Sequence, residues 1–122
     1  MNKSPFLGNN NVNQRRKDTI KLEIRHLNES SIKNALETTK PVLIDFYASW
    51  CEGCNSVDGI MTEFADENPD VEVYKINVDE SADIANKYGV MSVPTVLSLS
   101  VGEVKNRAVG SITKDEIKDL LN

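Results

Sequence analysis

Residues 42–54 read VLIDFYASWCEGC, an apolar run that leads into a pair of cysteines. The run from Val42 to Ala48 is nearly continuous, which is typical of a β-strand buried on both faces. Asp45 is the one charged residue within it. Burial raises the pKa of a carboxyl group, so we expect Asp45 to accept a proton near neutral pH. The alternative is a half-exposed aspartate at the end of the strand.

Cys51 and Cys54 are the only cysteines of the chain. If Cys54 begins a helical turn, Cys51 lies at the helix N-terminus, where unpaired N–H groups and the helix dipole favour a thiolate. The second sulfur is then close enough to attack a mixed disulfide formed on the first. The pair therefore predicts thiol–disulfide exchange, because a disulfide that closes so small a loop would stabilise the fold very little.

Two other interpretations of this pair are an inert buried disulfide and one half of a zinc site. A structural zinc site needs four ligands, and the only histidine, His26, lies far away along the sequence. We therefore expect no metal, and we expect His26 to be a surface residue at the end of a strand.

The length and composition are those of one soluble globular domain, with 122 residues of which 39% are hydrophobic and 27% charged. The formal net charge is -5, but residues 1–17 hold four basic residues and no acid (+4), which leaves -9 for the remainder. An acidic body argues against non-specific binding of nucleic acid. No run is long and apolar enough to span a membrane, so we expect neither kind of partner.

Residues 1–18 are polar and rich in Asn, with Pro5 and Gly8 as breakers. We expect a disordered extension here and a single domain over residues 19–122. The extension has no apolar segment of the kind that a secretory signal needs. Its basic character leaves an organelle transit peptide open, although it has few hydroxyl residues and little amphipathic pattern. We favour a loose tail and a cytoplasmic protein.

Hydrophobic periodicity predicts strands over residues 20–25, 42–48, 71–78, 95–100 and 104–109. Helices are predicted from a cap at Asn28 to about residue 38, from the cysteine pair to about residue 67, over residues 81–88, and after a capping box at Thr113–Glu116. The first strand alternates strictly, which favours an edge strand with one exposed face. The first strands should be parallel, and the last two should form an antiparallel hairpin.

In this order, the motifs of the chain resemble those of the thioredoxin family over residues 20–122. The matching motifs are Val42-Leu43-Ile44-Asp45-Phe46 leading into Ala48-Ser49-Trp50-Cys51, Lys75-Ile76-Asn77-Val78-Asp79, Tyr88-Gly89-Val90, Ser92-Val93-Pro94-Thr95, Gly102 and Gly110. The resemblance implies an α/β thioredoxin fold, with a mixed five-stranded sheet flanked by four helices. It also implies a cis peptide bond at Val93–Pro94 that faces the cysteines.

Catalytic roles follow from the resemblance at the matching positions. Cys51 resembles the nucleophile, which forms a mixed disulfide with the substrate, and Cys54 resembles the resolving thiol. Asp45 stands at the place of the family's buried aspartate. Lys75 resembles the lysine that approaches this carboxylate, although a solvated lysine is an equal alternative from the sequence.

The resemblance also implies a substrate groove next to the cysteines. Proline has no N–H, so Pro94 fits beside the sulfurs and leaves the backbone of Val93 free to pair with a bound peptide. The alternative is a trans proline that opens a strand. The substrate-binding residues that we expect are Trp50, Glu52, Gly53, Val78, Val93, Pro94 and Gly110.

The two residues between the cysteines, Glu52 and Gly53, differ from the family's usual Gly-Pro. A carboxylate at about 7 Å from the sulfur disfavours the Cys51 thiolate by roughly 0.6 to 1.2 kcal/mol. Glycine in place of proline loosens the first turn of the helix. Both changes bear on the redox potential, and their opposite signs leave its direction open.

The sequence thus predicts a protein-disulfide reductase that works through a reversible Cys51–Cys54 dithiol and disulfide pair. We expect its partners to be disulfide-containing proteins and a thioredoxin reductase-like electron donor, and we expect a monomer without a bound cofactor. An oxidant or disulfide isomerase is the alternative enzyme. A non-catalytic binding module, or a carrier of a metal or cluster, is the alternative from another class.

Overall fold

The computed structural model describes residues 24–122, so the extension predicted over residues 1–18 lies outside the described residues. In chain order the elements are β2 (Arg25–His26), α2 (Ile32–Leu36), β3 (Val42–Tyr47), α3 (Glu52–Glu67), β4 (Glu72–Asn77), α4 (Ala82–Lys87), β5 (Thr95–Ser100), β6 (Glu103–Val109) and α5 (Lys114–Leu120). Within the described residues, the predicted sheet of five strands with four helices is confirmed. None of these four helices is long and apolar enough to cross a membrane.

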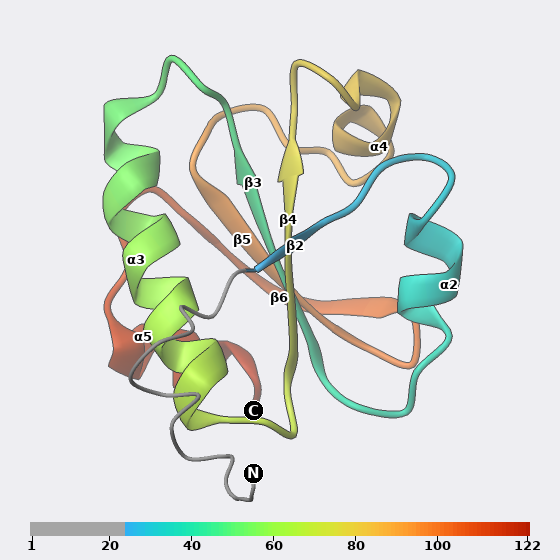
Figure 1. Ribbon diagram of the computed structural model, residues 1–122, viewed down its shortest axis with the longest axis vertical. Helices are drawn as coiled ribbons and strands as arrows, with labels where there is room; N and C mark the ends of the chain where they lie inside the picture. The colour runs from blue at the N-terminus through green and yellow to red at the C-terminus, as the bar shows by residue number, and fades with distance from the viewer. Residues whose placement is uncertain (1–23) are drawn as a thin grey trace, which may run out of the picture.

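The five strands form one sheet in the order β2-β4-β3-β5-β6 (Figure 1). β4 is parallel to both β2 and β3, whereas β5 is antiparallel to β3 and to β6. The predicted parallel first strands and the final hairpin are therefore confirmed. β3 is the central strand, so the cysteine pair that follows it lies at the middle of the sheet, beyond the C-terminal end of this strand.

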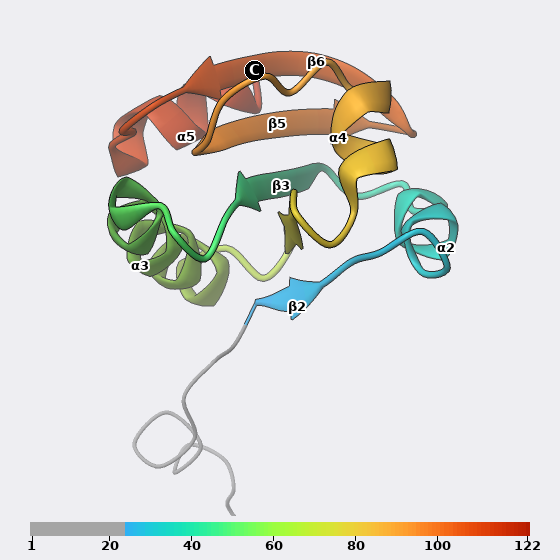
Figure 2. The ribbon, with the colours of Figure 1, turned by 90° about the horizontal axis from the view of Figure 1, so that it is seen from above.

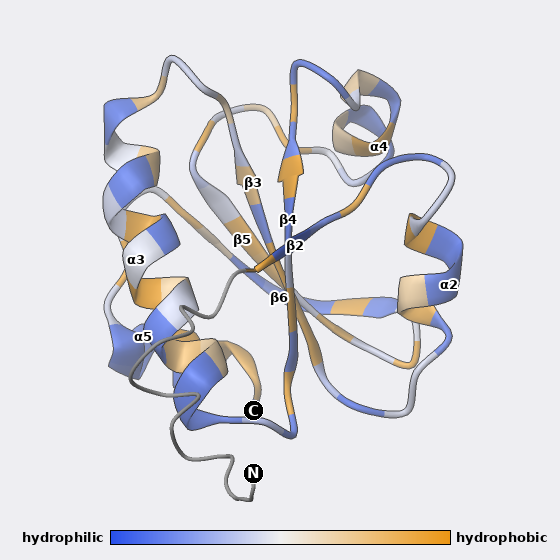
Figure 3. Ribbon diagram, in the orientation of Figure 1, coloured by the Kyte–Doolittle hydropathy of each residue, from blue (hydrophilic) through white to orange (hydrophobic). Residues whose placement is uncertain are grey.

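Helices cover both faces of this sheet, with α3 and α5 on one side and α2 and α4 on the other (Figure 2). Two clusters of buried apolar side chains fill the spaces between the layers. One includes Leu43 and Ile117 and lies under α3 and α5, and the other includes Phe46 and Ile84 and lies under α2 and α4. Figure 3 shows the matching alternation of hydrophilic and hydrophobic residues along α3.

The central strand β3 supplies both clusters because successive side chains of a strand point to opposite faces. Leu43 packs in the cluster of α3, whereas Ile44 and Phe46 pack in the other cluster. Asp45 is two residues after Leu43, so its carboxyl group is on the same face of the sheet, toward α3. All of β3 except its last residue is fully buried, which confirms the buried strand predicted here.

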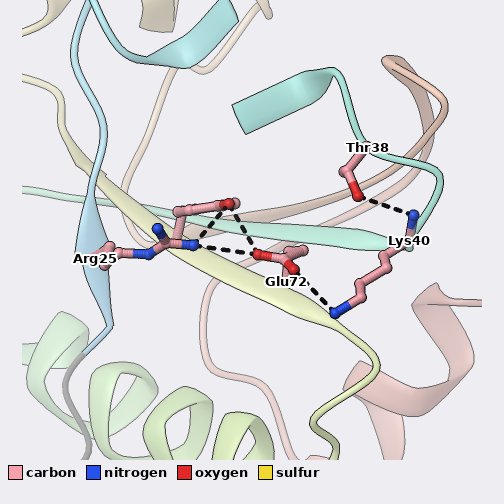
Figure 4. Close-up of polar contacts among 5 residues, drawn as sticks. Arg25, Thr38, Lys40 and Glu72 are labelled. Carbon is pink, nitrogen blue, oxygen red and sulfur yellow. Dashed lines mark hydrogen bonds and ion pairs between the residues drawn. The ribbon is translucent and has the colours of Figure 1, made fainter. Parts of the chain in front are cut away.

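The strand predicted over residues 20–25 falls largely on residues 20–23, which lie outside the described part of the chain, and the described strand β2 comprises Arg25 and His26. Among the described strands, β2 lies at one edge of the sheet, as predicted. Arg25 Nη2 lies 3.2 Å from Glu72 Oε1, and Lys40 Nζ lies 3.4 Å from Glu72 Oε2, so one carboxylate of β4 binds two cations (Figure 4). Such exposed ion pairs fix geometry more than they stabilise the fold.

The first helix begins later than predicted. α2 begins at Ile32, not near Asn28, and it ends at Leu36, two residues before the predicted end at about residue 38. The Asn28 side chain caps a separate turn, in which its Oδ1 accepts hydrogen bonds from the N–H groups of Ser30 at 2.9 Å and Ser31 at 3.1 Å. A side chain that satisfies a local turn competes with helix formation.

The last helix begins as predicted. Thr113 Oγ1 accepts a hydrogen bond from the Glu116 N–H at 3.2 Å, and Glu116 Oε1 accepts one from the Thr113 N–H at 2.8 Å. The capping box is therefore confirmed. It follows Gly110, whose φ of 93° lies in the left-handed region that favours glycine.

Candidate active site

The cysteine pair lies at the junction of β3 and α3. Cys51 is the N-cap of α3 and has an extended backbone, with φ -93° and ψ 110°, while the helix itself begins at Glu52. The Cys51 N–H donates a hydrogen bond to the Ala48 carbonyl at 3.1 Å, which fixes the turn between strand and helix. The prediction that Cys51 lies at a helix N-terminus is confirmed.

Cys51 and Cys54 form a disulfide, with their Cα atoms 5.4 Å apart. The two sulfurs differ in their surroundings, because Cys51 is half-buried whereas Cys54 has only 3% of its surface exposed. A thiol on a partner protein can therefore reach Cys51 but not Cys54. This asymmetry suits one attacking sulfur and one that acts from inside the protein.

A proline loop lies against the pair. The peptide bond between Val93 and Pro94 is cis. A Cβ placed on Gly53 would lie 3.9 Å from Pro94 Cδ, which is van der Waals contact and places the proline ring beside the residues between the cysteines. The Pro94 carbonyl accepts a hydrogen bond from the Gly110 N–H at 2.8 Å. Gly53, Pro94 and Gly110, which are distant in sequence, thus meet at one end of the sheet.

A shallow groove of about 120 Å³ lies next to this loop and is lined by Trp50, Val78, Val90, Met91, Ser92 and Val93. It brings together three of the predicted substrate-binding residues, Trp50, Val78 and Val93. Trp50 is 69% exposed, and its Nε1 donates a hydrogen bond to Asp79 Oδ2 at 3.0 Å. Gly110 does not line the groove, and Glu52 and Gly53 are exposed beside it.

Met91 is, with Val90 and Ser92, one of the three groove residues that the sequence analysis missed. Its side chain is 95% exposed, which is unusual for a large apolar residue. A signal was present in the sequence, because Met91 stands in a short loop between Gly89 and Pro94 where no helix or strand is predicted to bury it.

Asp45 is fully buried, so the alternative of a half-exposed aspartate is wrong. Neither carboxylate oxygen has a hydrogen-bond partner among residues 24–122. Burial raises the pKa of Asp45 from 3.8 to about 7, and the negative charge of Asp58 adds to this shift while Lys75 opposes it. A carboxyl group of this kind can gain or lose a proton near neutral pH.

Lys75 lies beside Asp45 but forms its ion pair with another residue. This residue is the register partner of Asp45 on β4, and its charge is near enough to lower the pKa of that carboxyl. Its Nζ nevertheless forms an ion pair with Asp58 Oδ1 at 2.9 Å, and not with Asp45. The Asp58 side chain is 41% exposed, so pairing there leaves both charges partly hydrated, whereas an approach to Asp45 would require the ammonium to lose its water.

Asp58 is thus a site residue that the sequence analysis missed. It follows Cys54 by four positions, so the two residues lie one turn apart on the same side of α3. The helical spacing was used to place only the apolar residues of this helix.

His26 is exposed at the end of β2, as predicted, with its Nε2 2.7 Å from the Tyr47 hydroxyl.

The residues needed for redox chemistry are therefore close together. Within residues 24–122, no group of three or more His, Cys, Asp or Glu side chains is arranged to hold a metal ion.

Comparisons with known proteins agree with this geometry. The family model described as thioredoxin matches residues 23–122. A thioredoxin of Mycoplasmoides gallisepticum is 34% identical over 99 residues, which are 80% of this chain and 99% of that protein. An M-type chloroplastic thioredoxin of Spinacia oleracea is 38% identical over 99 residues, 80% of this chain and 55% of that protein. The structure of a mutant thioredoxin from Halobacterium salinarum superposes with a TM-score of 0.75 at 34% identity, covering 81% of this chain and 88% of that one.

Proposed function

Because this chain belongs to the thioredoxin family, it is a thiol–disulfide oxidoreductase, and we propose that it reduces disulfide bonds in partner proteins. The observation that best supports exchange with protein disulfides is the unequal exposure of the two sulfurs at the start of α3. An accessible sulfur at a helix N-terminus is a good nucleophile, because the helix dipole favours its thiolate. A buried second sulfur one turn later can end the reaction before another molecule intervenes.

In the first step, the Cys51 thiolate of the reduced protein attacks one sulfur of the substrate disulfide. A bond forms between Cys51 and that sulfur, the substrate S–S bond breaks, and the other substrate sulfur leaves as a thiolate. The groove positions the substrate for this attack, with Trp50 and Val93 in contact with it and the backbone of Val93 pairing with the extended peptide.

In the second step, Cys54 releases the substrate. Asp45 in its carboxylate form takes the Cys54 proton, and the Cys54 thiolate then attacks Cys51 Sγ. The Cys51–Cys54 disulfide forms while the second substrate sulfur leaves, so the substrate gains two electrons and the protein loses two. A reductase that supplies two electrons restores the dithiol. A cytoplasmic location and a monomeric state stay predictions from the sequence.

The experiment is insulin reduction with dithiothreitol, using the parent chain and two single variants. We expect the parent to accelerate reduction, Cys51→Ser to abolish the acceleration, and Cys54→Ser to form a stable mixed disulfide through Cys51. The equilibrium redox potential of the parent gives the direction. A potential near or below the cytosolic glutathione poise supports a reductase, whereas one far above it, near that of strong oxidants, would contradict the proposal.

A further inference from the structure

We propose that Asp58 is a positioning residue that holds the Lys75 ammonium on α3, keeps this charge from neutralising Asp45, and so sets the pH at which Asp45 can take the proton of Cys54. The inference rests on the proposed function, in which Asp45 is the base for Cys54. It adds a residue to that site and gives it a regulatory effect on the second step.

The geometry places three charged groups on one side of the sheet. Asp45 and Lys75 are register partners on neighbouring parallel strands, so their side chains leave the sheet on the same face, toward α3. Asp58 comes down from α3 and meets the ammonium at 2.9 Å. The carboxylate of Asp45 is left without a hydrogen-bond partner among the described residues.

Lys75 is held from a second direction as well. Its Nζ lies 5.3 Å from the centroid of the Tyr47 ring, within range of a cation–π contact. The Tyr47 hydroxyl is in turn 2.7 Å from His26 Nε2. The ammonium therefore has two partners, Asp58 and Tyr47, and neither of them is the buried carboxylate that lies beside it in the sheet.

Within residues 24–122, few titratable groups besides Lys75, Asp58 and Tyr47 face Asp45. β5 presents an apolar register partner, Val96, and α5 contributes the apolar Ile117 to the cluster on this face. The titratable or charged groups on this face near Asp45 are Lys75 from β4, Asp58 and the thiol form of Cys54 from α3, Tyr47 from β3 itself and His26 from β2.

Asp58 acts on Asp45 in two ways that have the same sign. Its own negative charge disfavours a second carboxylate nearby, and its ion pair holds the Lys75 ammonium where it favours that carboxylate less than direct contact would. The charge of Asp58 raises the pKa of Asp45, after burial itself, which is the largest cause, and Lys75 from its present place only partly opposes this shift. Because only the carboxylate form accepts a proton, Asp58 moves the working range of Asp45 upward toward neutral pH.

The test compares Asp58→Asn with a matched control and a rescue variant. Asp66→Asn removes the same charge from an exposed position of α3 two turns further on, and Asp58→Glu keeps the charge at the site. We expect a carbon-13 carboxyl titration of the oxidised protein to show the Asp45 pKa lower by about one unit in Asp58→Asn, unchanged in Asp66→Asn, and close to the parent value in Asp58→Glu. The ion pair is partly exposed, so we expect all three variants to fold.

The second readout is the pH dependence of the resolving step. When the reduced protein reacts with the aromatic disulfide DTNB, the first thiolate released reports attack by Cys51 and the second reports attack by Cys54. We expect the rate of the second thiolate release to fall at low pH, and we expect the midpoint of this fall to lie about one pH unit lower in Asp58→Asn than in the parent and the other two variants.

Two results would contradict the role of Asp58, and a third would contradict the proposed function. An Asp45 titration that is the same in Asp58→Asn as in the parent overturns the inference and leaves the proposed function intact. A shifted titration with an unmoved second release overturns the inference as well, because it shows that Asp45 is not the base for Cys54. Failure of the parent itself to reduce insulin refutes the proposed function.

Discussion

At the scale of single residues, Asp45 is a carboxyl group inside an apolar strand, and its raised pKa has a consequence for stability. A group whose pKa is higher in the folded chain binds its proton more tightly there, so the folded state loses stability as the pH rises from the unfolded value toward the folded one. With values of 3.8 and about 7, most of this loss falls between pH 4 and 7.

We therefore predict that Asp45→Asn abolishes a pH-dependent part of the stability. Between pH 5 and pH 8 the parent should lose roughly 3 kcal/mol through this group, at about 1.4 kcal/mol per pKa unit, and the variant should lose none of it. Urea denaturation of the oxidised proteins at both pH values measures the difference. Any constant cost of burying the amide cancels in this comparison. Equal losses in parent and variant would show that Asp45 is ionised at pH 5.

The burial of Asp45 could be predicted because its neighbours along β3 are apolar on both sides. The partner of Lys75 could not, because the choice between two carboxylates depends on how much water each retains in the folded protein. Asp58 was within reach of sequence reasoning, since its spacing from Cys54 places it one helical turn away. It was missed because only apolar residues of that helix were placed by their spacing.

At the scale of elements, two negatively charged groups lie at the N-terminus of α3. Glu52 is the acidic residue of its first turn, and the Cys51 thiolate forms at the same end of the helix. The positive end of the dipole favours both, but each charge disfavours the other through Coulomb repulsion. The side chain of Glu52 is exposed, so this repulsion is moderated by water.

We predict that Glu52→Gln makes Cys51 more reactive. The rate of alkylation of the reduced protein by iodoacetamide at pH 6 should rise about two- to threefold, because a larger thiolate fraction outweighs the lower nucleophilicity of each thiolate. Asp66→Asn, which removes a charge further along α3, is the matched control and should leave the rate unchanged. A rate equal to that of the parent in Glu52→Gln would mean that the carboxylate is too well screened to act on the sulfur.

The elements that the sequence predicted best are those with strong boundaries. β5 spans residues 95–100 as predicted, because Pro94 precedes it and the turn at Val101 and Gly102 ends it. α2 was placed poorly for the opposite reason. Its apolar pattern is weak, and none of its residues is fully buried. The turn at Asn28 that precedes it also resembles the start of a helix.

At the scale of the whole molecule, an acidic protein presents an apolar surface at one end of its sheet. Trp50 and Met91 are among its most exposed large apolar side chains within residues 24–122, and both line the groove beside the cysteines. Exposed apolar side chains that gather at one place mark a surface for a partner. The site thus offers protein substrates a contact that small disulfides do not need.

We predict that Met91→Ser separates these two kinds of substrate. Loss of an exposed apolar contact at the centre of an interface typically costs about 1 to 2 kcal/mol of binding, so kcat/KM for insulin should fall about five- to thirtyfold. The rate with DTNB should stay within about twofold of the parent, because this molecule needs only the Cys51 sulfur. Val104→Ser, at an exposed apolar position on β6 away from the groove, is the matched control and should change neither rate. An equal loss with both substrates would mean that Met91 supports the structure of the loop and not the contact with proteins.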